Sequence, residues 1–265
     1  MQGARPLPRL AFGAGISPGE RVLPEETAVA LSFNVSTQAV MMATPADLED
    51  FAYGFALTEG IATPAEIEAV EVARGPRGID VQTWLVPAAE ARLATRRRTM
   101  AGPVGCGLCG IDSIEQALRD LPPVPVSPFR LTPAQVMAAV AALPAGQPLH
   151  DATRAAHCAG FWSAGQLVTR EDVGRHNALD KLAGHLVRQP PVTGAIVLTS
   201  RVSIDMVQKV AALRQPVLIA VSAPTADAVA LAEALNITLI ALARPDRFEL
   251  FTHSDRIAAE VPHVR

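Results

Sequence analysis

The sequence lacks the features of a nucleic-acid-binding protein, a membrane protein and a secreted protein. Its 265 residues include 23 basic and 26 acidic side chains, giving a net charge of −3 and a pI of about 6.1, so we expect no basic surface for nucleic acid. The longest apolar stretch, residues 229–243, is interrupted by Glu233, Asn236 and Thr238 and cannot span a membrane. The first residues contain no apolar signal-peptide core. Three cysteines, an odd number, are not typical of a secreted disulfide scaffold. We therefore expect a cytoplasmic protein.

What the chain does contain is enough apolar residues for a large core, with 49% hydrophobic and 18% charged residues. Residues 1–24, rich in Gly and Pro, predict an irregular lead-in. Beyond them, period-two alternation predicts strands, and Thr44-Pro45 predicts a helix start with Thr44 as its cap. We expect strands at 25–34, 38–44, 65–74 and 78–86, and helices from Pro45 to near Gly60 and at 88–98.

A proline-rich stretch after residue 121 predicts a connection between two domains, because proline continues neither a helix nor a central strand. We divide the chain into a smaller α+β domain, residues 1–121, a connector, residues 122–133, and an α/β domain, residues 134–265. In the last domain, apolar β-branched runs at 195–199, 217–221 and 237–242 alternate with helical segments. This alternation predicts a parallel three-stranded core covered by helices.

Ligands of parallel sheets bind beyond the carboxyl ends of the strands. The residues expected at that edge carry hydroxyl groups and guanidinium groups, which suit phosphate oxygens. Plain surface arginines are an equally good interpretation. The candidates are Ser200, Arg201, Ser222, Arg244 and Arg247.

The chain's most reactive segment is Gly105-Cys106-Gly107-Leu108-Cys109-Gly110. Glycines leave both sulfurs accessible, and the following residues predict a helix start, whose dipole favours a thiolate. Structural zinc bound by Cys106, Cys109, His157 and Cys158 is disfavoured, because adjacent His and Cys rarely bind one ion. A zinc deaminase is excluded, because no histidine is followed by x-Glu. Thiol–disulfide exchange and sulfur relay both remain open, and Cys158 is expected to be a buried apolar residue.

A further polar segment, Asp172-Val173-Gly174-Arg175-His176-Asn177, leads into a predicted helix over 178–187. Asp172, Arg175 and His176 are expected either to orient a ligand or to brace the cysteine loop. The alternative is a purely structural helix start with Asn177 as its cap.

These segments carry a resemblance to a known family. The runs 41–51, 105–110, 170–181, 206–209 and 220–225 match it, and Gly174-Arg175-His176-Asn177-Ala178-Leu179-Asp180-Lys181 is the most specific. On these residues the sequence resembles the formate dehydrogenase accessory sulfurtransferases, the FdhD family, from about residue 25 to residue 253. Asp246 and Phe251 depart from the residues common in the family, glycine and tyrosine.

The resemblance implies a sulfur carrier that takes sulfur from a cysteine desulfurase as a persulfide on Cys106, with Cys109 assisting. The acceptor would be the molybdenum cofactor in its bis-molybdopterin guanine dinucleotide form, bound as substrate, before insertion into formate dehydrogenase. The implied binding stretch is Leu242-Ala243-Arg244-Pro245-Asp246-Arg247, with Arg175 and His176 near the pterin.

The resemblance also implies that the second domain is similar to the cytidine deaminase fold without its zinc site. It leaves open whether the chain forms a homodimer. The alternative function, from a different functional class, is that of a non-catalytic chaperone that binds the cofactor through its phosphates.

Overall fold

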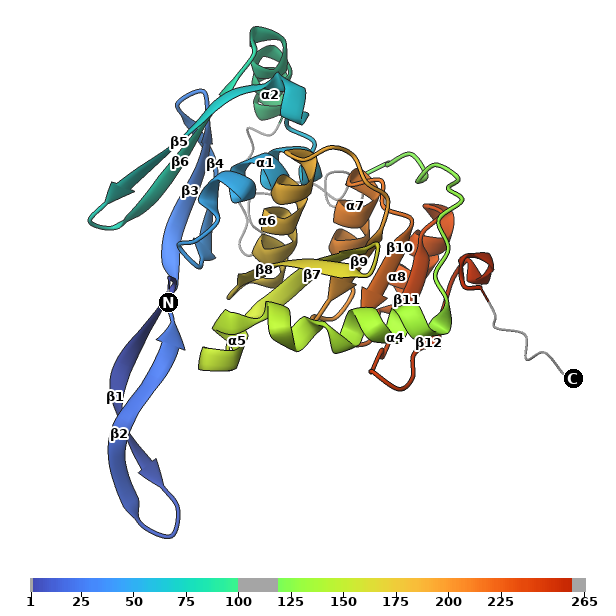
Figure 1. Ribbon diagram of the computed structural model, residues 1–265. Helices are drawn as coiled ribbons and strands as arrows, with labels where there is room; N and C mark the ends of the chain where they lie inside the picture. The colour runs from blue at the N-terminus through green and yellow to red at the C-terminus, as the bar shows by residue number, and fades with distance from the viewer. Residues whose placement is uncertain (1, 100–118, 259–265) are drawn as a thin grey trace, which may run out of the picture.

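The structure is a computed structural model that describes residues 2–99 and 119–258. It contains two sheets packed against helices and a separate two-stranded hairpin that projects from the body (Figure 1). Within the described residues, no helix is long and apolar enough to cross a membrane.

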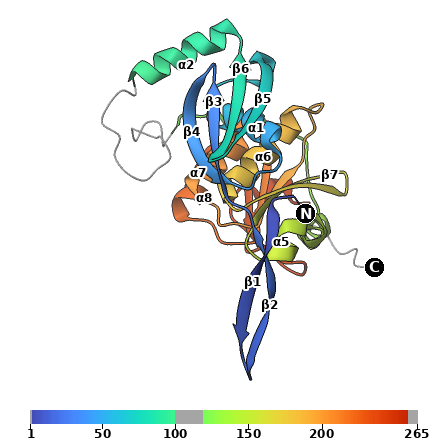
Figure 2. The ribbon, with the colours of Figure 1, turned by 90° about the vertical axis from the view of Figure 1, so that its left-hand side faces the viewer.

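The first 24 residues form this long hairpin, so the predicted irregular lead-in is wrong. β1 (Ala4–Phe12) pairs antiparallel with β2 (Ile16–Pro24) along their whole lengths, and the hairpin extends away from the rest of the chain (Figures 1 and 2). Glycine and proline weaken most strands, which is why the composition favours a loop. Proline is tolerated where its missing N–H would point to an open edge, and a two-stranded hairpin has two such edges.

The four strands predicted in the first part are present, and they form one four-stranded sheet in the order β4-β3-β6-β5. The strands are β3 (Thr27–Phe33), β4 (Ser36–Ala43), β5 (Ile67–Gly75) and β6 (Gly78–Leu85). One face is covered by α1 (Leu48–Thr58), where Phe51 and Phe55 pack against Phe33 and Leu31. α2 (Pro87–Thr99) follows β6, as predicted.

The start of α1 differs from the prediction. Asp47, in the left-handed region with φ of 53°, precedes the first helical residue, so Thr44 is not the cap. Thr44 is buried, its N–H donates to Asp172 Oδ2 over 3.0 Å, and its hydroxyl accepts from the N–H of Val173 over 3.2 Å. A Thr-Pro pair suits a helix cap, but here a distant segment supplies stronger partners for the same groups.

The second part contains a six-stranded sheet in the order β12-β11-β10-β9-β7-β8. β9, β10 and β11 are parallel and adjacent, which confirms the predicted parallel core. β7 was not predicted, because its small residues hide the strand pattern, and it pairs antiparallel with both β8 and β9. The strands are β7 (His157–Ser163), β8 (Gln166–Asp172), β9 (Ala195–Leu198), β10 (Val217–Ala220), β11 (Thr238–Ala241) and β12 (Glu249–Leu250).

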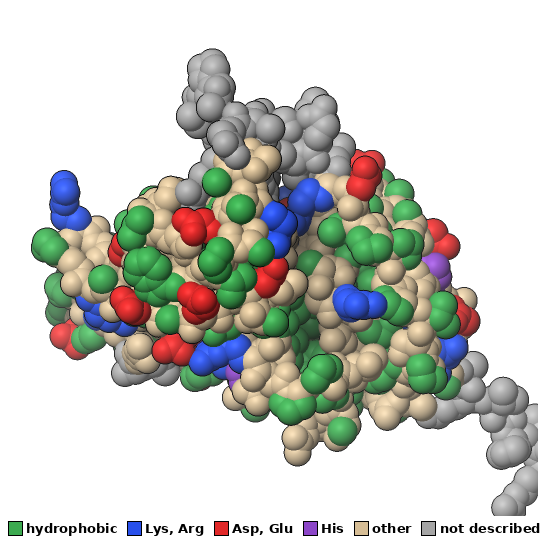
Figure 3. Space-filling model, turned by 90° about the horizontal axis from the view of Figure 1, so that it is seen from above, with side chains coloured by type: hydrophobic (Ala, Val, Ile, Leu, Met, Phe, Trp, Pro, Cys, Tyr) green, Lys and Arg blue, Asp and Glu red, His purple; other side chains and the backbone are tan. Residues whose placement is uncertain are grey.

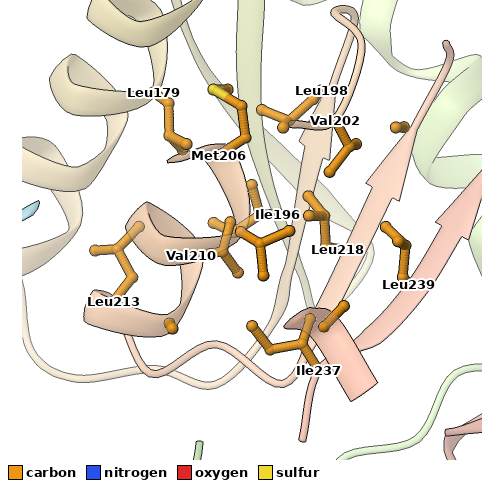
Figure 4. Packing of buried hydrophobic residues seen from close by; sticks show 14 of the residues in the cluster. Leu179, Ile196, Leu198, Val202, Met206, Val210, Leu213, Leu218, Ile237 and Leu239 are labelled. Carbon is orange, nitrogen blue, oxygen red and sulfur yellow. The ribbon is translucent and has the colours of Figure 1, made fainter. Parts of the chain in front are cut away.

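Helices cover both faces of this sheet and make three layers (Figure 1). On one face Leu179, Met206 and Val210 pack against Ile196 and Leu218 (Figure 4). On the other face the helix α4 packs against alternate residues of the same strands. The helices are α4 (Pro133–Ala141), α5 (Pro148–Thr153), α6 (Arg175–Val187), α7 (Ile204–Ala212) and α8 (Ala226–Ala234). The α/β class is confirmed, and the likeness to cytidine deaminase stays a prediction.

The two parts meet where α1 crosses α6. A Cβ built on Gly54 would lie 1.7 Å from the carbonyl oxygen of Asp180, and one built on Gly184 would lie 1.7 Å from that of Asp50. The absence of side chains at these two glycines therefore lets the helix backbones touch. The predicted domain boundaries at residues 121 and 133 stay predictions.

Buried ion pairs line the same junction. Lys181 Nζ lies 2.6 Å from Asp172 Oδ2, and both side chains are fully buried. Lys209 Nζ lies 2.9 Å from Asp180 Oδ1 and 2.7 Å from Glu59 Oε1. Lys209 reaches across the junction to Glu59, and the Lys181–Asp172 pair is bonded to Thr44 of the first part. Opening the junction would therefore leave buried charges without these partners.

Candidate functional site

The loops that follow β9, β10 and β11 lie side by side at the carboxyl edge of the sheet. The N–H of Val202 donates to Ala223 O over 3.2 Å, and the N–H of Leu242 donates to Ser222 O over 3.2 Å. These bonds bring together the predicted segments 200–201, 222–225 and 242–247. Ser200 is buried and its hydroxyl donates to Arg201 O, whereas Arg201 and Ser222 are more accessible. We call these three loops the carboxyl rim.

The two candidate arginines of the last loop differ in what they can do. Arg244 is half-buried, and its Nη1 donates to Val221 O over 2.6 Å and to Ala243 O over 2.8 Å. The side chain of Arg247 is 74% exposed, and its nearest carboxylate, that of Asp246, is 3.7 Å away. Arg244 therefore holds the loop to the sheet, while Arg247 is available to an anion.

The start of α6 reaches the same edge through α7. His176 Nε2 donates to Asp205 Oδ2 in the first turn of α7, directly after the rim loop 199–203. Burial acts to raise the pKa of Asp205, but the hydrogen bonds that its carboxylate accepts, the one from His176 first among them, together with the charge of His176 outweigh burial, and that pKa lies well below its ordinary value. This pairing places Arg175 and His176 beside the carboxyl rim.

A second histidine lies at this edge; the sequence offered it only as a candidate zinc ligand and did not place it here. His157 is the first residue of β7, and because β7 runs antiparallel to β9, its start lies where β9 ends. Burial, together with the nearby charge of Arg175, lowers the pKa of His157 below the ordinary histidine value. Neither His157 nor Asp205 belongs to a local motif; only the strand order and the helix pairing reveal them.

Residues 172–181, which include the motif most specific to the family, divide into buried side chains and partly exposed ones. Asp172, Asn177 and Lys181 are buried, and Asn177 Nδ2 donates to Met42 O over 2.9 Å and to Asp172 Oδ1 over 3.0 Å. Gly174, not Asn177, is the N-cap of α6. These residues therefore brace the first part against the second, whereas Arg175 and His176 remain partly exposed and available to a ligand.

Cys106 and Cys109 lie outside the described residues, so their geometry is not part of the site described here. Cys158 is 2% exposed in β7, and burial raises the pKa of its thiol far above the ordinary value. A thiol with a raised pKa is neither a nucleophile nor a metal ligand at neutral pH. Across residues 2–99 and 119–258, no group of three or more His, Cys, Asp or Glu side chains could hold a metal ion.

A cavity of about 490 Å³ lies at the opposite end of the sheet from the carboxyl rim. It is lined by the β7–β8 hairpin, the end of α6 and residues 189–192. Figure 3 looks down onto this upper end of the molecule, where acidic, basic and apolar side chains are interspersed around a hollowed surface. The carboxyl rim, rather than this apolar cavity, gathers the polar groups.

Comparisons with known proteins agree with the resemblance inferred from the sequence. Residues 24–258 match the model of the FdhD/NarQ family. A relative from Agrobacterium fabrum, named sulfur carrier protein FdhD, is 54% identical over 244 residues, covering 90% of each chain. One of the same name from Brucella abortus is 53% identical, covering 92% of this chain and 93% of its own.

A solved structure gives the same result for the fold. A crystal structure from Desulfotalea psychrophila, of a protein named for an accessory role with formate dehydrogenase, superposes with a TM-score of 0.74 at 26% identity. The match covers 96% of this chain and 99% of the other. With the family model and the close relatives in agreement, this chain belongs to the FdhD/NarQ family.

Proposed function

We propose that this chain carries sulfur as a persulfide on Cys106, taking it from a cysteine desulfurase. It passes the sulfur to the molybdenum cofactor, in its bis-molybdopterin guanine dinucleotide form, before that substrate enters formate dehydrogenase, whose activity would depend on the transfer. Relatives named for sulfur carriage at 54% and 53% identity support the proposal.

The observation that carries this proposal is the state of the cysteines. The chain has three, and Cys158 is enclosed in β7 with its thiol pKa raised. A sulfur carrier needs an accessible thiolate that two different partners can reach. Only Cys106 and Cys109, with glycines before, between and after them, satisfy the sequence requirement.

The chemistry balances with these two thiols. The Cys106 thiolate attacks the outer sulfur of the donor's persulfide, the donor's S–S bond breaks, and the donor cysteine leaves as a thiolate. At hand-over the Cys109 thiolate attacks the Cys106 sulfur, so that a disulfide forms and the outer sulfur leaves as sulfide with the bonding electron pair. A cellular dithiol then reduces the disulfide and restores both thiols.

The carboxyl rim suits the guanine dinucleotide end of such a substrate. Arg247 is exposed, Arg201 and Ser222 stand on neighbouring loops, and Arg175 and His176 lie beside them. Guanidinium groups and hydroxyls are the usual partners of phosphate oxygens. In this proposal the phosphates lie near Arg247, while Arg175 and His176 face the pterin.

After incubation with a cysteine desulfurase and cysteine, peptide mass spectrometry should find one extra sulfur atom on Cys106. The extra sulfur should persist in Cys109→Ala and in the matched control Cys158→Ala, and it should be absent in Cys106→Ala. Extra sulfur confined to Cys109 would reverse the two roles. If neither cysteine gains sulfur and Cys106→Ala still supports formate dehydrogenase, the chain is a cofactor chaperone instead.

Arg247→Ala should weaken binding of GDP by about tenfold or more, because one charge-assisted hydrogen bond to phosphate is lost. Isothermal titration calorimetry measures this change. Arg214→Ala, an exposed arginine at the opposite end of β10, is the matched control and should bind GDP as the unchanged protein does. Equal affinities for all three proteins would remove Arg247 from the binding site.

A further inference from the structure

The cavity at the far end of the sheet from the carboxyl rim takes no part in the proposed sulfur chemistry. Its volume is about 490 Å³, within the range of small-molecule pockets, roughly 300–1,000 Å³. It lies between the β7–β8 hairpin and the end of α6, which are neighbours in Figure 1. Most of its lining is apolar and includes Phe161, Val168, Leu186, Pro190, Pro191 and Leu213. Such a lining favours a ligand that buries apolar surface.

Hydrogen bonds hold the wall formed by the segment between α6 and β9. Gln215 Nε2 donates to Val192 O over 3.1 Å, and Gln215 Oε1 accepts from the N–H of Gly194 over 2.9 Å. Ser163 Oγ donates to Thr193 O over 3.2 Å. Three successive residues of this wall are therefore fixed to the rest of the domain. A ligand that enters a preformed cavity does not bear the cost of ordering its walls.

The histidine in the lining is oriented by a chain of hydrogen bonds behind it. Asp50 Oδ2 accepts from Arg170 Nε over 2.9 Å and from Arg170 Nη2 over 2.7 Å. Arg170 Nη2 also donates to His185 Nδ1 over 2.8 Å. Because Nδ1 accepts this bond, the proton of the neutral ring is on Nε2. Among the residues that the structure describes, Nε2 has no partner, so its N–H is a free donor at the cavity.

The charges around His185 are already paired, so the cavity suits an uncharged ligand. Arg188 Nη1 donates to Asp50 Oδ1 over 2.7 Å and its Nη2 to Glu49 Oε2 over 2.8 Å, while Arg170 is held by Asp50. Burial, and then the positive charge of Arg170, lower the pKa of His185 below its ordinary value, so the ring is neutral at pH 7. A charged ligand would lose its water here and find no free counter-charge.

The remaining groups indicate the shape and chemistry of the ligand. Phe161, Pro190 and Pro191 present ring surfaces, against which another ring system packs well. Gln166 and Gln189 are exposed members of the lining, and their side-chain amides can bond the heteroatoms of such a ring. We propose that this cavity binds an uncharged, fused aromatic ring system whose carbonyl oxygen or ring nitrogen accepts a hydrogen bond from His185 Nε2. The proposed sulfur transfer does not depend on this site.

A fluorescence titration of the full chain tests the proposal. The probe is 7-amino-4-methylcoumarin, an uncharged fused-ring lactone whose emission changes when it leaves water. We expect saturable binding of this probe, and binding of 2-naphthoate, an anion of similar size, that is about tenfold weaker or more. GDP in excess should not displace the coumarin, because the carboxyl rim lies at the other end of the sheet. This competition separates the cavity from the site proposed for the guanine dinucleotide.

Two substitutions of His185 separate its contact with the ligand from its contact with Arg170. In His185→Asn the side-chain oxygen can still accept from Arg170, but no N–H remains at the position of Nε2, so the coumarin should bind about fivefold more weakly. In His185→Gln the amide nitrogen reaches the position of Nε2, so the affinity should stay within about twofold.

A third substitution fills the cavity. Val168 is 38% exposed in its lining, and Val168→Trp should weaken coumarin binding by about tenfold or more. The matched control is Val126→Trp, at a position that is 92% exposed and outside the lining, and it should bind the coumarin as the unchanged protein does. Circular dichroism should show the same fold for all four variants.

The other possible results would each overturn a stated part of the proposal. Absence of saturable coumarin binding would show that the cavity is not a site for this class of ligand. Tighter binding of 2-naphthoate would show that the ligand is an anion. Coumarin binding that survives Val168→Trp, or that GDP displaces, would place the probe outside the cavity. Equal affinities in His185→Asn and His185→Gln would remove His185 Nε2 as the donor.

Discussion

Lys181→Met is expected to lower the free energy of unfolding by about 3–5 kcal/mol, the range for breaking a fully buried ion pair. Lys181 Nζ lies 2.6 Å from Asp172 Oδ2 and 2.8 Å from Thr44 O, with no solvent access on either side chain. Methionine has a similar length but no charge, so Asp172 would remain buried with only neutral donors. Urea unfolding followed by circular dichroism measures the loss.

A double-mutant cycle separates the charge from the packing. Lys181→Met/Asp172→Asn removes both charges, and we expect it to recover part of the stability lost in Lys181→Met. Arg92→Ala is the matched control, because Arg92 pairs with Glu66 over 2.7 Å at the surface, and it should cost at most about 1 kcal/mol. A cost for Lys181→Met no larger than that of Arg92→Ala would show that the buried pair does not hold the two parts together.

Gly54→Ala and Gly184→Ala are each expected to destabilise the protein by about 3 kcal/mol or more, at the upper end of overpacking costs. Each new methyl group would lie 1.7 Å from a backbone carbonyl oxygen of the facing helix, and backbone cannot rotate aside as a side chain can. In a helix without such a contact, alanine would stabilise the protein by about 1 kcal/mol relative to glycine. A loss of stability instead of a gain would therefore show that the backbones of α1 and α6 touch at these positions. Thermal unfolding of each single variant provides the measurement.

Gly13→Ala is the control for these two substitutions. Nothing lies within 4 Å of a Cβ built on Gly13, and its backbone is outside the left-handed region. We expect its stability to stay within about 0.5 kcal/mol of the unchanged protein. If Gly54→Ala or Gly184→Ala instead raised the melting temperature, the two helices would have to be farther apart than described here.

Several elements could be predicted because their signal is local. The apolar β-branched runs that became β9, β10 and β11, and the alternation of β3 and β6, identify strands from neighbouring residues alone. The burial of Cys158 was expected because a free cysteine usually behaves as a small apolar residue, and it is confirmed. The hairpin at Ala4–Pro24 was missed because its prolines suit a strand only at unbonded edge positions, and a single sequence does not show which positions those are.

The candidate site was only partly predictable for a related reason. The loops after three parallel strands must meet at one edge, so Ser200, Ser222 and Arg247 could be grouped in advance. The sequence could not distinguish Arg244, which binds backbone carbonyls, from the exposed Arg247. Asp205 and His157 reach the same edge only through the packing of α7 beside α6 and the antiparallel course of β7.

By itself, the sequence determined the family, the Cys-x-x-Cys spacing between glycines and the parallel core, because motif spacing and hydrophobic periodicity are properties of adjacent residues. Only the tertiary structure decided what the most specific run does. Asp172 and Lys181 form a buried pair that also bonds Thr44, about 130 positions earlier in the chain, while His176 in the same run turns toward Asp205. The reason is physical: the partner of a buried charge is chosen by which chain segments pack together, and that choice is made by the whole fold.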